Sequence, residues 1–473
     1  MSENAVPGQA RPAAPVTSAS AEPSSQFGLT TAIALIMGSI IGVGIFNLPS
    51  SLAAFGPITL VSMALTTVGA LALAVLFGTL SRRLPADGGP YAYARAAFGN
   101  AFGFMNAWSY WITAWAGNAA IAVGWVLYVQ HFINKDGNKL FSILLVLVGL
   151  WAPAAINLSG VKNMGAIQVV TTILKFAALA FMSTVGLFFI NTAHFTPFNV
   201  SGQSAALAIG SGMAIALFSY LGVETASVAA GKVKDPDRNV PRATILGTIA
   251  TALVYMLSLV ALFGILPNHE LATVSAPYSA AVDAMFGGTA WGNVMAVIVI
   301  ISGLGALNGW TMICAEMPRA AAKDGLFPDR FKRMSKAGVP AFGIVSSTLL
   351  ASVAMIVNYL GDSGERAFTT LVLMTGITAA IPYAFSALAQ IRFRWNDRRA
   401  LVNTRFFRDV TVAVIALLFS IAFIWYSRNT GAESAWTYWA PFILAGVALL
   451  IGIPVYNAQR GHMTPPEAVP AYR

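Results

Sequence analysis

Charged residues are scarce in this chain. They make up 10% of its 473 residues, whereas 57% are hydrophobic. A soluble domain carries about 25% charged residues, so this composition excludes an ordinary soluble enzyme or binding module. Cysteine and histidine are also rare, with one and four residues. The single Cys314 cannot form an intramolecular disulfide, and the histidines are far apart in sequence, so no disulfide framework, metal site or other cofactor is predicted.

Two sequence signals are missing as well. A P-loop, G-x-x-x-x-G-K-[ST], does not occur, which argues against ATP-driven pumping within this chain. The first 26 residues are rich in Pro, Ala and Ser but lack the charged start and the A-x-A site of a signal peptide. We expect residues 1–26 to form a disordered cytoplasmic tail, and residues 457–473 to form a second cytoplasmic tail.

Long apolar runs, in contrast, are abundant. Stretches of about 20 residues, the length that crosses ~30 Å of hydrocarbon, recur from Phe27 to Tyr456. They predict an all-α integral membrane protein with twelve transmembrane helices in one domain, residues 27–456. The expected spans are 28–54, 57–80, 100–130, 140–158, 165–190, 203–230, 242–266, 288–316, 340–360, 367–390, 410–427 and 436–456.

Lysine and arginine are unevenly divided between the loops. Short cytoplasmic loops retain positive charge. With the N-terminus inside, the inner segments hold 23 of the 28 Lys and Arg, and the outer loops hold only Lys135, Lys139, Arg366 and Arg428. We therefore expect a multi-pass protein of the cell (inner or plasma) membrane with both termini cytoplasmic. A basic face against the lipid bilayer explains the formal charge of +10, so no nucleic-acid partner is needed.

Glycines interrupt the first and the sixth predicted spans. The first contains Gly38, Gly42 and Gly44 followed by Pro49, and the sixth has a similar glycine-rich stretch at 210–222. Glycine disfavours a continuous helix. Interruptions at corresponding positions of two halves indicate an inverted repeat whose broken helices build a substrate site. A single cluster could equally serve close helix packing, but two matching clusters favour the broken helices.

A break inside a membrane has specific consequences. Unwinding frees backbone groups that lipid cannot satisfy, so it is tolerated only where they line a cavity. A zwitterionic ligand meets this need. We expect its carboxylate near the N–H groups of Gly42, Val43 and Gly44, and its ammonium near freed carbonyls at Ile40 and Leu221.

Two ionisable residues, Lys175 and Glu224, lie inside otherwise apolar stretches. A charge at bilayer depth costs about 2.5 to 3.5 kcal/mol on insertion scales and usually faces a water-filled or substrate-filled path. Glu224 either binds a cation, takes up a proton or forms a structural hydrogen bond while protonated. Lys175 lies near the middle of its span, too far from the ends to snorkel to an interface. Both residues indicate a transporter.

Four stretches of the chain resemble one known family. They are GSIIGVGIFNLP at 38–49, GGPYAYARAAFGNAFGFMNAWSYWITAWAGN at 88–118, SYLGVETASVAAGKVKDPDRNVP at 219–241 and LNGWTMICAEMPRAAAKDGLF at 307–327. The chain is similar to the amino acid/polyamine/organocation transporter superfamily, and within it resembles the basic amino acid and polyamine antiporters, which include the arginine/agmatine exchanger.

This resemblance implies a fold and a mechanism. The fold is the LeuT-type five-plus-five inverted repeat with discontinuous helices 1 and 6, and the mechanism is alternating access. Repeat one would cover residues about 27–190, repeat two about 203–390, and the peripheral helices about 410–456.

The resemblance also assigns roles to side chains. Val43 stands where the arginine exchanger has a serine, and Phe218 where it has a tryptophan that stacks on the guanidinium. Phenylalanine is the weaker cation-π face. The third span supplies Ala114 and Asn118 to the substrate site. The resemblance also assigns Trp115 to the site and Trp310 to its floor. It gives gating roles to Tyr110, which matches a position that lines the site, and to Tyr383, which matches a tyrosine of the inner gate.

Each assignment competes with a plainer interpretation. The aromatic residues could be ordinary packing or interface-belt residues, and Asn118 could only join two helices. Glu224 matches a glutamate that couples pH to transport. Lys175 departs from the arginine exchanger, which has a small apolar residue there. Proton-coupled relatives carry this lysine, whose ammonium replaces a sodium ion between the first and eighth spans, so sodium dependence is not expected.

We therefore expect a secondary active transporter, and not an enzyme. Its expected substrates are cationic amino acids, or an amino acid exchanged for its amine or for another amino acid. The first alternative is a proton-coupled permease for neutral amino acids, which Lys175, Val43 and Phe218 favour. The second is a substrate-sensing receptor on a transporter scaffold. The two short tails argue against it, because they leave no room for a signalling domain. Proton coupling and assembly as a homodimer stay open.

Overall fold

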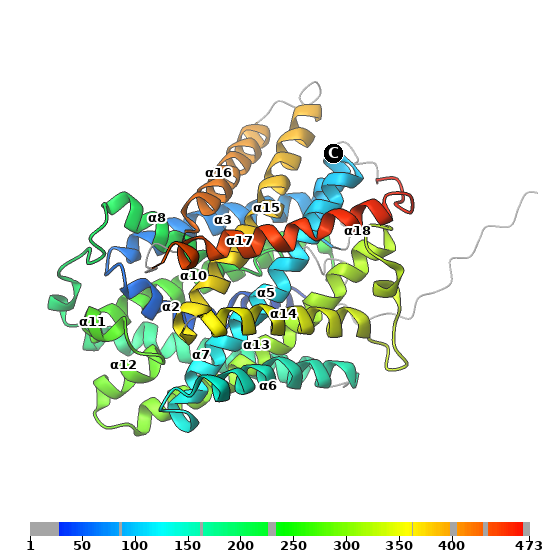
Figure 1. Cartoon of the computed structure of the whole chain (residues 1–473). Helices are drawn as coiled ribbons and strands as arrows, with labels where there is room; N and C mark the ends of the chain where they lie inside the picture. The colour runs from blue at the N-terminus through cyan, green and yellow to red at the C-terminus, as the bar shows by residue number, and fades with distance from the viewer. Residues whose placement is uncertain are drawn as a thin grey trace, which may run out of the picture.

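The chain is a bundle of helices. The computed structural model describes residues 28–84, 88–160, 164–225, 233–361, 363–397, 404–428 and 434–466. All regular elements within these ranges are helices, which confirms the predicted all-α class (Figure 1). Leucine, valine, isoleucine and phenylalanine side chains are exposed on the outside of many of the helices, as expected for a protein that faces lipid.

The helices that make up the predicted spans follow their expected bounds closely. They are α1 (Leu29–Ile40), α2 (Gly44–Ala53), α3 (Thr59–Arg83), α5 (Asn100–Ile133), α6 (Lys139–Leu158), α7 (Met164–Thr184), α8 (Ala205–Ala216), α10 (Pro236–Ile265), α13 (Ala290–Lys323), α14 (Ala341–Gly361), α15 (Gly364–Asp397), α16 (Thr404–Tyr426), α17 (Ala435–Leu450) and α18 (Gly452–Gln459). The short ones are α4 (Pro90–Phe98), η1 (Gly186–Phe189), η2 (Thr192–Phe195), η3 (Leu217–Tyr220), α11 (Asn268–Leu271), α12 (Pro277–Phe286) and η5 (Asp329–Lys332).

The number of membrane spans agrees with the sequence except at one place. Within the described ranges, 10 helices are long and apolar enough to cross a membrane, or 11 if the bent pair α1 and α2 counts as one span. The one predicted span that is not among these helices is the sixth, 203–230. Its first part is a short apolar helix at Ala205–Tyr220, and residues 226–232 lie outside the described ranges. Twelve spans and the inverted repeat therefore stay predictions.

Both expected helix breaks are present. The first span stops at Ile40, restarts at Gly44, and bends by 41° between α1 and α2. In the sixth span η3 ends at Tyr220, and Leu221 is extended. Gly222 follows with φ +104°, where a Cβ atom would lie 2.9 Å from the backbone carbonyl of Ser39. Only glycine fits this conformation and this distance, so the two breaks touch each other.

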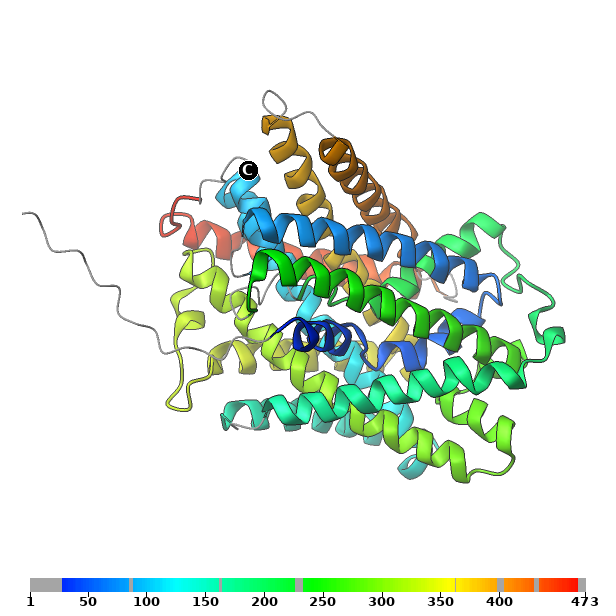
Figure 2. The same cartoon turned by 180° about the vertical axis from the view of Figure 1, so that it is seen from behind.

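The broken spans lie against long, unbroken helices. α5 passes through the middle of the molecule (Figure 1), and its most apolar stretch is completely buried. α1 packs against α10 and α7 (Figure 2). At one end of the bundle, Arg83 of α3 donates two hydrogen bonds to Asp397 of α15, at 2.6 and 3.0 Å, and Arg394 pairs with Asp409 of α16. These buried ion pairs fix the C-terminal end of α15.

Candidate functional site

A small cavity lies where the two breaks meet. Its volume is about 20 Å³, which is room for about one water molecule. The first span contributes Ser39, Ile40, Gly42, Gly44 and Ile45; α5 contributes Gly117 and Ile121; the sixth span contributes Phe218, Ser219 and Leu221; and α13 contributes Trp310. Because the cavity is far smaller than an amino acid, side chains around it must move before a substrate can bind.

The N-terminus of α2 points backbone donors at this cavity. The first N–H groups of a helix have no partner within the helix. Val43, which precedes α2, provides no side-chain cap, and no acidic residue lies in the first turn. The helix dipole adds partial positive charge at the same place. The amides around Gly44 are therefore available to an anionic group, and the binding of a substrate carboxylate there stays a prediction.

The carbonyls of the break are already occupied by donors from the protein. The Ile40 oxygen accepts hydrogen bonds from the Tyr255 hydroxyl at 3.0 Å and from the Gly42 amide at 2.9 Å. The Val43 oxygen accepts one from the Asn47 side chain at 3.2 Å. In this conformation Ile40 has no lone pair left for a substrate ammonium, because a carbonyl oxygen offers two. Sequence reasoning did not identify Tyr255 or Asn47.

Lys175 holds the other side of the break. Its Nζ donates a hydrogen bond to the Gly38 carbonyl at 3.0 Å, and its side chain is fully buried. α7 lies tightly against α1, since a Cβ on Gly38 would come within 2.6 Å of Thr172. In the described part of the chain, no carboxylate lies within ion-pair distance of Lys175. The lysine thus connects α7 to the end of α1 through a backbone group alone.

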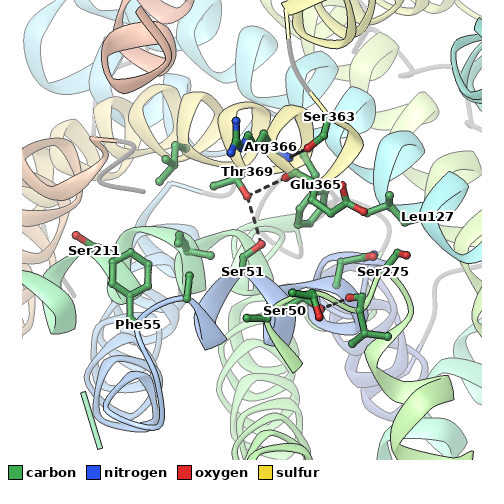
Figure 3. Close-up of a pocket in the computed structure, with 18 of the residues that line it drawn as sticks. Ser50, Ser51, Phe55, Leu127, Ser211, Ser275, Ser363, Glu365, Arg366 and Thr369 are labelled. Carbon is green, nitrogen blue, oxygen red and sulfur yellow. Dashed lines mark hydrogen bonds between the residues drawn. The ribbon is translucent and has the colours of Figure 1, made fainter. Parts of the chain in front are cut away.

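Phe218 forms the lid of the cavity. A Cβ on Gly44 would lie 2.6 Å from the Phe218 ring, and one on Gly117 would lie 3.9 Å from its other edge. The ring also meets Phe368 edge-on, with centroids 6.1 Å apart. Beyond Phe368 lies a larger pocket of about 430 Å³ between α2 and α15, which we call the vestibule (Figure 3). Phe218 therefore separates the vestibule from the small cavity.

Glu224, in the turn after η3, connects two long helices in a buried cluster. Its two carboxylate oxygens each accept a 2.7 Å hydrogen bond, one from the Tyr110 hydroxyl of α5 and one from the Tyr383 hydroxyl of α15. All three side chains are buried. The structure thus brings together three residues that the sequence identified separately. Glu224 does not line the small cavity, so in this conformation it lies behind the cavity wall, where it accepts from the two tyrosines.

The remaining predicted site residues lie close to the cavity but do not line it. Ala114 is fully buried on α5. Asn118 donates a 3.2 Å hydrogen bond to Thr311, and its buried side-chain oxygen has no hydrogen-bond partner. Trp115 has an unpartnered ring nitrogen. The helical rotation of α5 presents Gly117 and Ile121 to the cavity instead, four residues apart on one face.

Comparison with known proteins agrees with this architecture. The amino acid permease family model matches residues 27–452. The chain is 35% identical over 421 residues to the arginine/ornithine antiporter of Pseudomonas aeruginosa, covering 85% of this chain and 86% of that one. It is 30% identical to the putrescine transporter PotE of Haemophilus influenzae (88% and 94% covered), and 26% identical to the cadaverine/lysine antiporter of Escherichia coli (89% and 94%).

A solved structure supports the fold. The crystal structure of a manganese transporter of Eremococcus coleocola matches with a TM-score of 0.57, covering 94% of this chain and 97% of that one. The two are 14% identical, so the likeness shows the fold alone. Together with the apolar helices, the match to the family model shows that this chain is a multi-pass membrane protein that belongs to the amino acid permease family.

Proposed function

We propose that this protein exchanges a cationic amino acid for an amine or for another amino acid across the inner membrane. The observation that carries the proposal is the small cavity between two touching helix breaks, which combines free amides near Gly44 with the aromatic faces of Phe218 and Trp310. The three relatives described above are named as arginine/ornithine, putrescine and cadaverine/lysine transporters. All of these substrates carry a cationic side chain or a second ammonium group.

Each part of such a substrate has a complementary group in the site. The α-carboxylate binds the amides at the start of α2. The cationic side chain lies between Phe218 and Trp310, because aromatic faces attract desolvated cations. The unpartnered oxygen of Asn118 is a hydrogen-bond acceptor near the same end of the site. A neutral side chain would leave these last contacts unused, so the neutral-permease alternative is less favoured.

Alternating access then needs two gates. On one side of the cavity, Phe218 and Phe368 separate it from the vestibule. On the other, the two tyrosine hydrogen bonds to Glu224 join α5, α15 and the sixth span. The vestibule contains Arg366 and Arg428, which the charge distribution assigns to outer loops. We therefore assign the vestibule to the outer side of the membrane, with Phe218 covering the cavity on that side, the cytoplasmic side closed, and both termini inside.

The broader architecture belongs to the same proposal. Spans one to five and six to ten form the inverted repeat, residues 27–190 and 203–390, and α16 to α18 are peripheral. Glu224 couples protonation to the inner gate, since protonation turns one of its two acceptor oxygens into a donor and so weakens or reverses one of the two tyrosine hydrogen bonds. Assembly as a homodimer is a further prediction, which size measurement in detergent tests.

Exchange itself is tested in liposomes that contain the purified protein and radiolabelled ornithine. We expect external arginine, lysine or putrescine to accelerate efflux of the label, and external alanine to do so much less. Efflux that is indifferent to the external solute would contradict exchange and support a symporter.

Trp310→Ala tests the selectivity for cations. In this variant we expect cationic substrates to bind about 1 to 2 kcal/mol more weakly, with a smaller loss for neutral ones. Trp291→Ala, on the exposed face of α13, is the matched control.

Gly44→Leu tests the carboxylate site. A side chain at this position would collide with Phe218 and fill the space above the α2 amides. We expect exchange to stop for every amino acid, measured in the same liposomes. Gly446→Leu is the control, because a Cβ at Gly446 meets nothing within 4 Å. Retained exchange in a folded Gly44→Leu protein would contradict the proposed carboxylate position.

Lys175 tests proton coupling. If Lys175 releases and rebinds a proton during the cycle, Lys175→Ala should lose most of the pH dependence of transport or stop transporting, and added sodium should not restore it. Lys175→Arg should also fail, because arginine stays protonated. Lys139→Ala is the control, since Lys139 also donates to a backbone carbonyl but on the exposed surface. A wild-type pH profile in Lys175→Arg would make the lysine a fixed structural cation.

A further inference from the structure

The vestibule is polar on two facing walls. Glu365, Arg366 and Thr369 come from the start of α15, and Ser50 and Ser51 come from α2 on the opposite side (Figure 3). The hydroxyls of Ser51 and Thr369 point toward one another at 3.3 Å. A pocket of about 430 Å³ with such walls is large enough for an amino acid. The central site does not account for these polar groups.

Arg428 is the most informative of the lining residues. Its guanidinium carbon lies 4.5 Å from the ring centre of Trp425 and 5.8 Å from that of Trp439. These rings hold a half-buried cation in place against the vestibule. Its buried Nε has no hydrogen-bond partner. Among the residues that the structure describes, no carboxylate lies within ion-pair distance of Arg428. The guanidinium is therefore a cation that, within the described residues, is stabilised by two aromatic rings and not by an ion pair.

The charges around the vestibule favour a ligand with a carboxylate. The described lining residues include one acidic side chain, Glu365, and two basic ones, Arg366 and Arg428. α17, which begins at Ala435, turns its N-terminal residue Thr437 to the same pocket, and its dipole adds partial positive charge there. A diamine would bring two positive charges into this field. A cationic amino acid brings the same side-chain cation but also a carboxylate.

We propose that the vestibule is a second binding site, in which Arg428 binds the α-carboxylate of an amino acid before the ligand passes Phe218. The site selects amino acids over amines that lack a carboxylate. The effect of this selection on transport rests on the proposed function: the vestibule would concentrate amino acids on the outer side and would not retain a released amine. The binding itself does not depend on that function.

The test uses two ligands that differ by one carboxylate, ornithine and putrescine. In the Gly44→Leu protein the central site is filled, so saturation-transfer NMR in detergent reports the vestibule alone. We expect ornithine to bind and putrescine to bind far more weakly. Arg428→Gln in this background should weaken ornithine about tenfold, near the lower end for a charge-assisted hydrogen bond that water partly screens. Arg428→Lys should keep part of the affinity.

Arg392→Gln is the matched control. Arg392 also lies over an aromatic ring, Phe98, at 5.4 Å. Arg392 lies far from the vestibule, because it is about 40 Å along α15 from the vestibule residue Arg366 at 1.5 Å per residue. We expect no change in ornithine binding there. If Arg428→Gln does not fold, acetate replaces the mutation: it should displace ornithine from the Gly44→Leu protein, whereas methylammonium at the same ionic strength should displace less.

Two results would overturn the vestibule site. One is equal ornithine affinity with and without the Arg428 guanidinium, and the other is putrescine binding as tightly as ornithine. In transport assays, the single variant Arg428→Gln should have a KM for external ornithine about tenfold higher than that of the wild type, whereas the KM for putrescine should change little. Binding without exchange in wild type would refute the proposed function and leave the vestibule site standing. Exchange without vestibule binding would do the reverse.

Discussion

The structure depends on how the first span satisfies its own break. Lipid offers no hydrogen bonds, so carbonyls freed at mid-membrane need donors from the protein. Lys175 of α7 donates to Gly38, Tyr255 of α10 donates to Ile40, and Asn47 donates to Val43. The break therefore exists only while α7 and α10 pack against α1. The same arrangement satisfies the carbonyls but leaves the amides at the start of α2 for a ligand.

Much of this could be predicted from local sequence. Glycines at 38, 42, 44 and 222 disfavour a helix wherever they occur, and a lone Lys175 or Glu224 in an apolar span stands out without knowledge of its neighbours. Tyr255 could not be predicted in the same way, because a tyrosine in a membrane span is equally consistent with ordinary packing. Likewise, only the assembled fold shows that Tyr110 and Tyr383 donate to one carboxylate.

The exact lining of the site was also beyond sequence reasoning. Which residues of α5 face the cavity depends on the rotation of that helix, and a shift of one residue turns it by about 100°. Ala114 and Asn118 therefore lie beside the cavity, while Gly117 and Ile121 line it. The glycine leaves space beside the Phe218 ring, which a larger side chain on α5 would occupy. The twelve-span count stays untested because part of the sixth span, 226–232, lies outside the described residues.

The two gates differ in kind, and this has a mechanical consequence. In the proposed mechanism the barrier to the vestibule is a phenylalanine ring that a rotamer change can move, whereas the proposed inner gate opens only when two hydrogen bonds to a buried carboxylate break. The most direct test of the whole account is a structure by electron cryo-microscopy with bound ornithine. We predict the carboxylate within hydrogen-bond distance of the amides around Gly44, with the first span still broken at 41–43. A first span that is continuous, or a carboxylate bound away from α2, would contradict it.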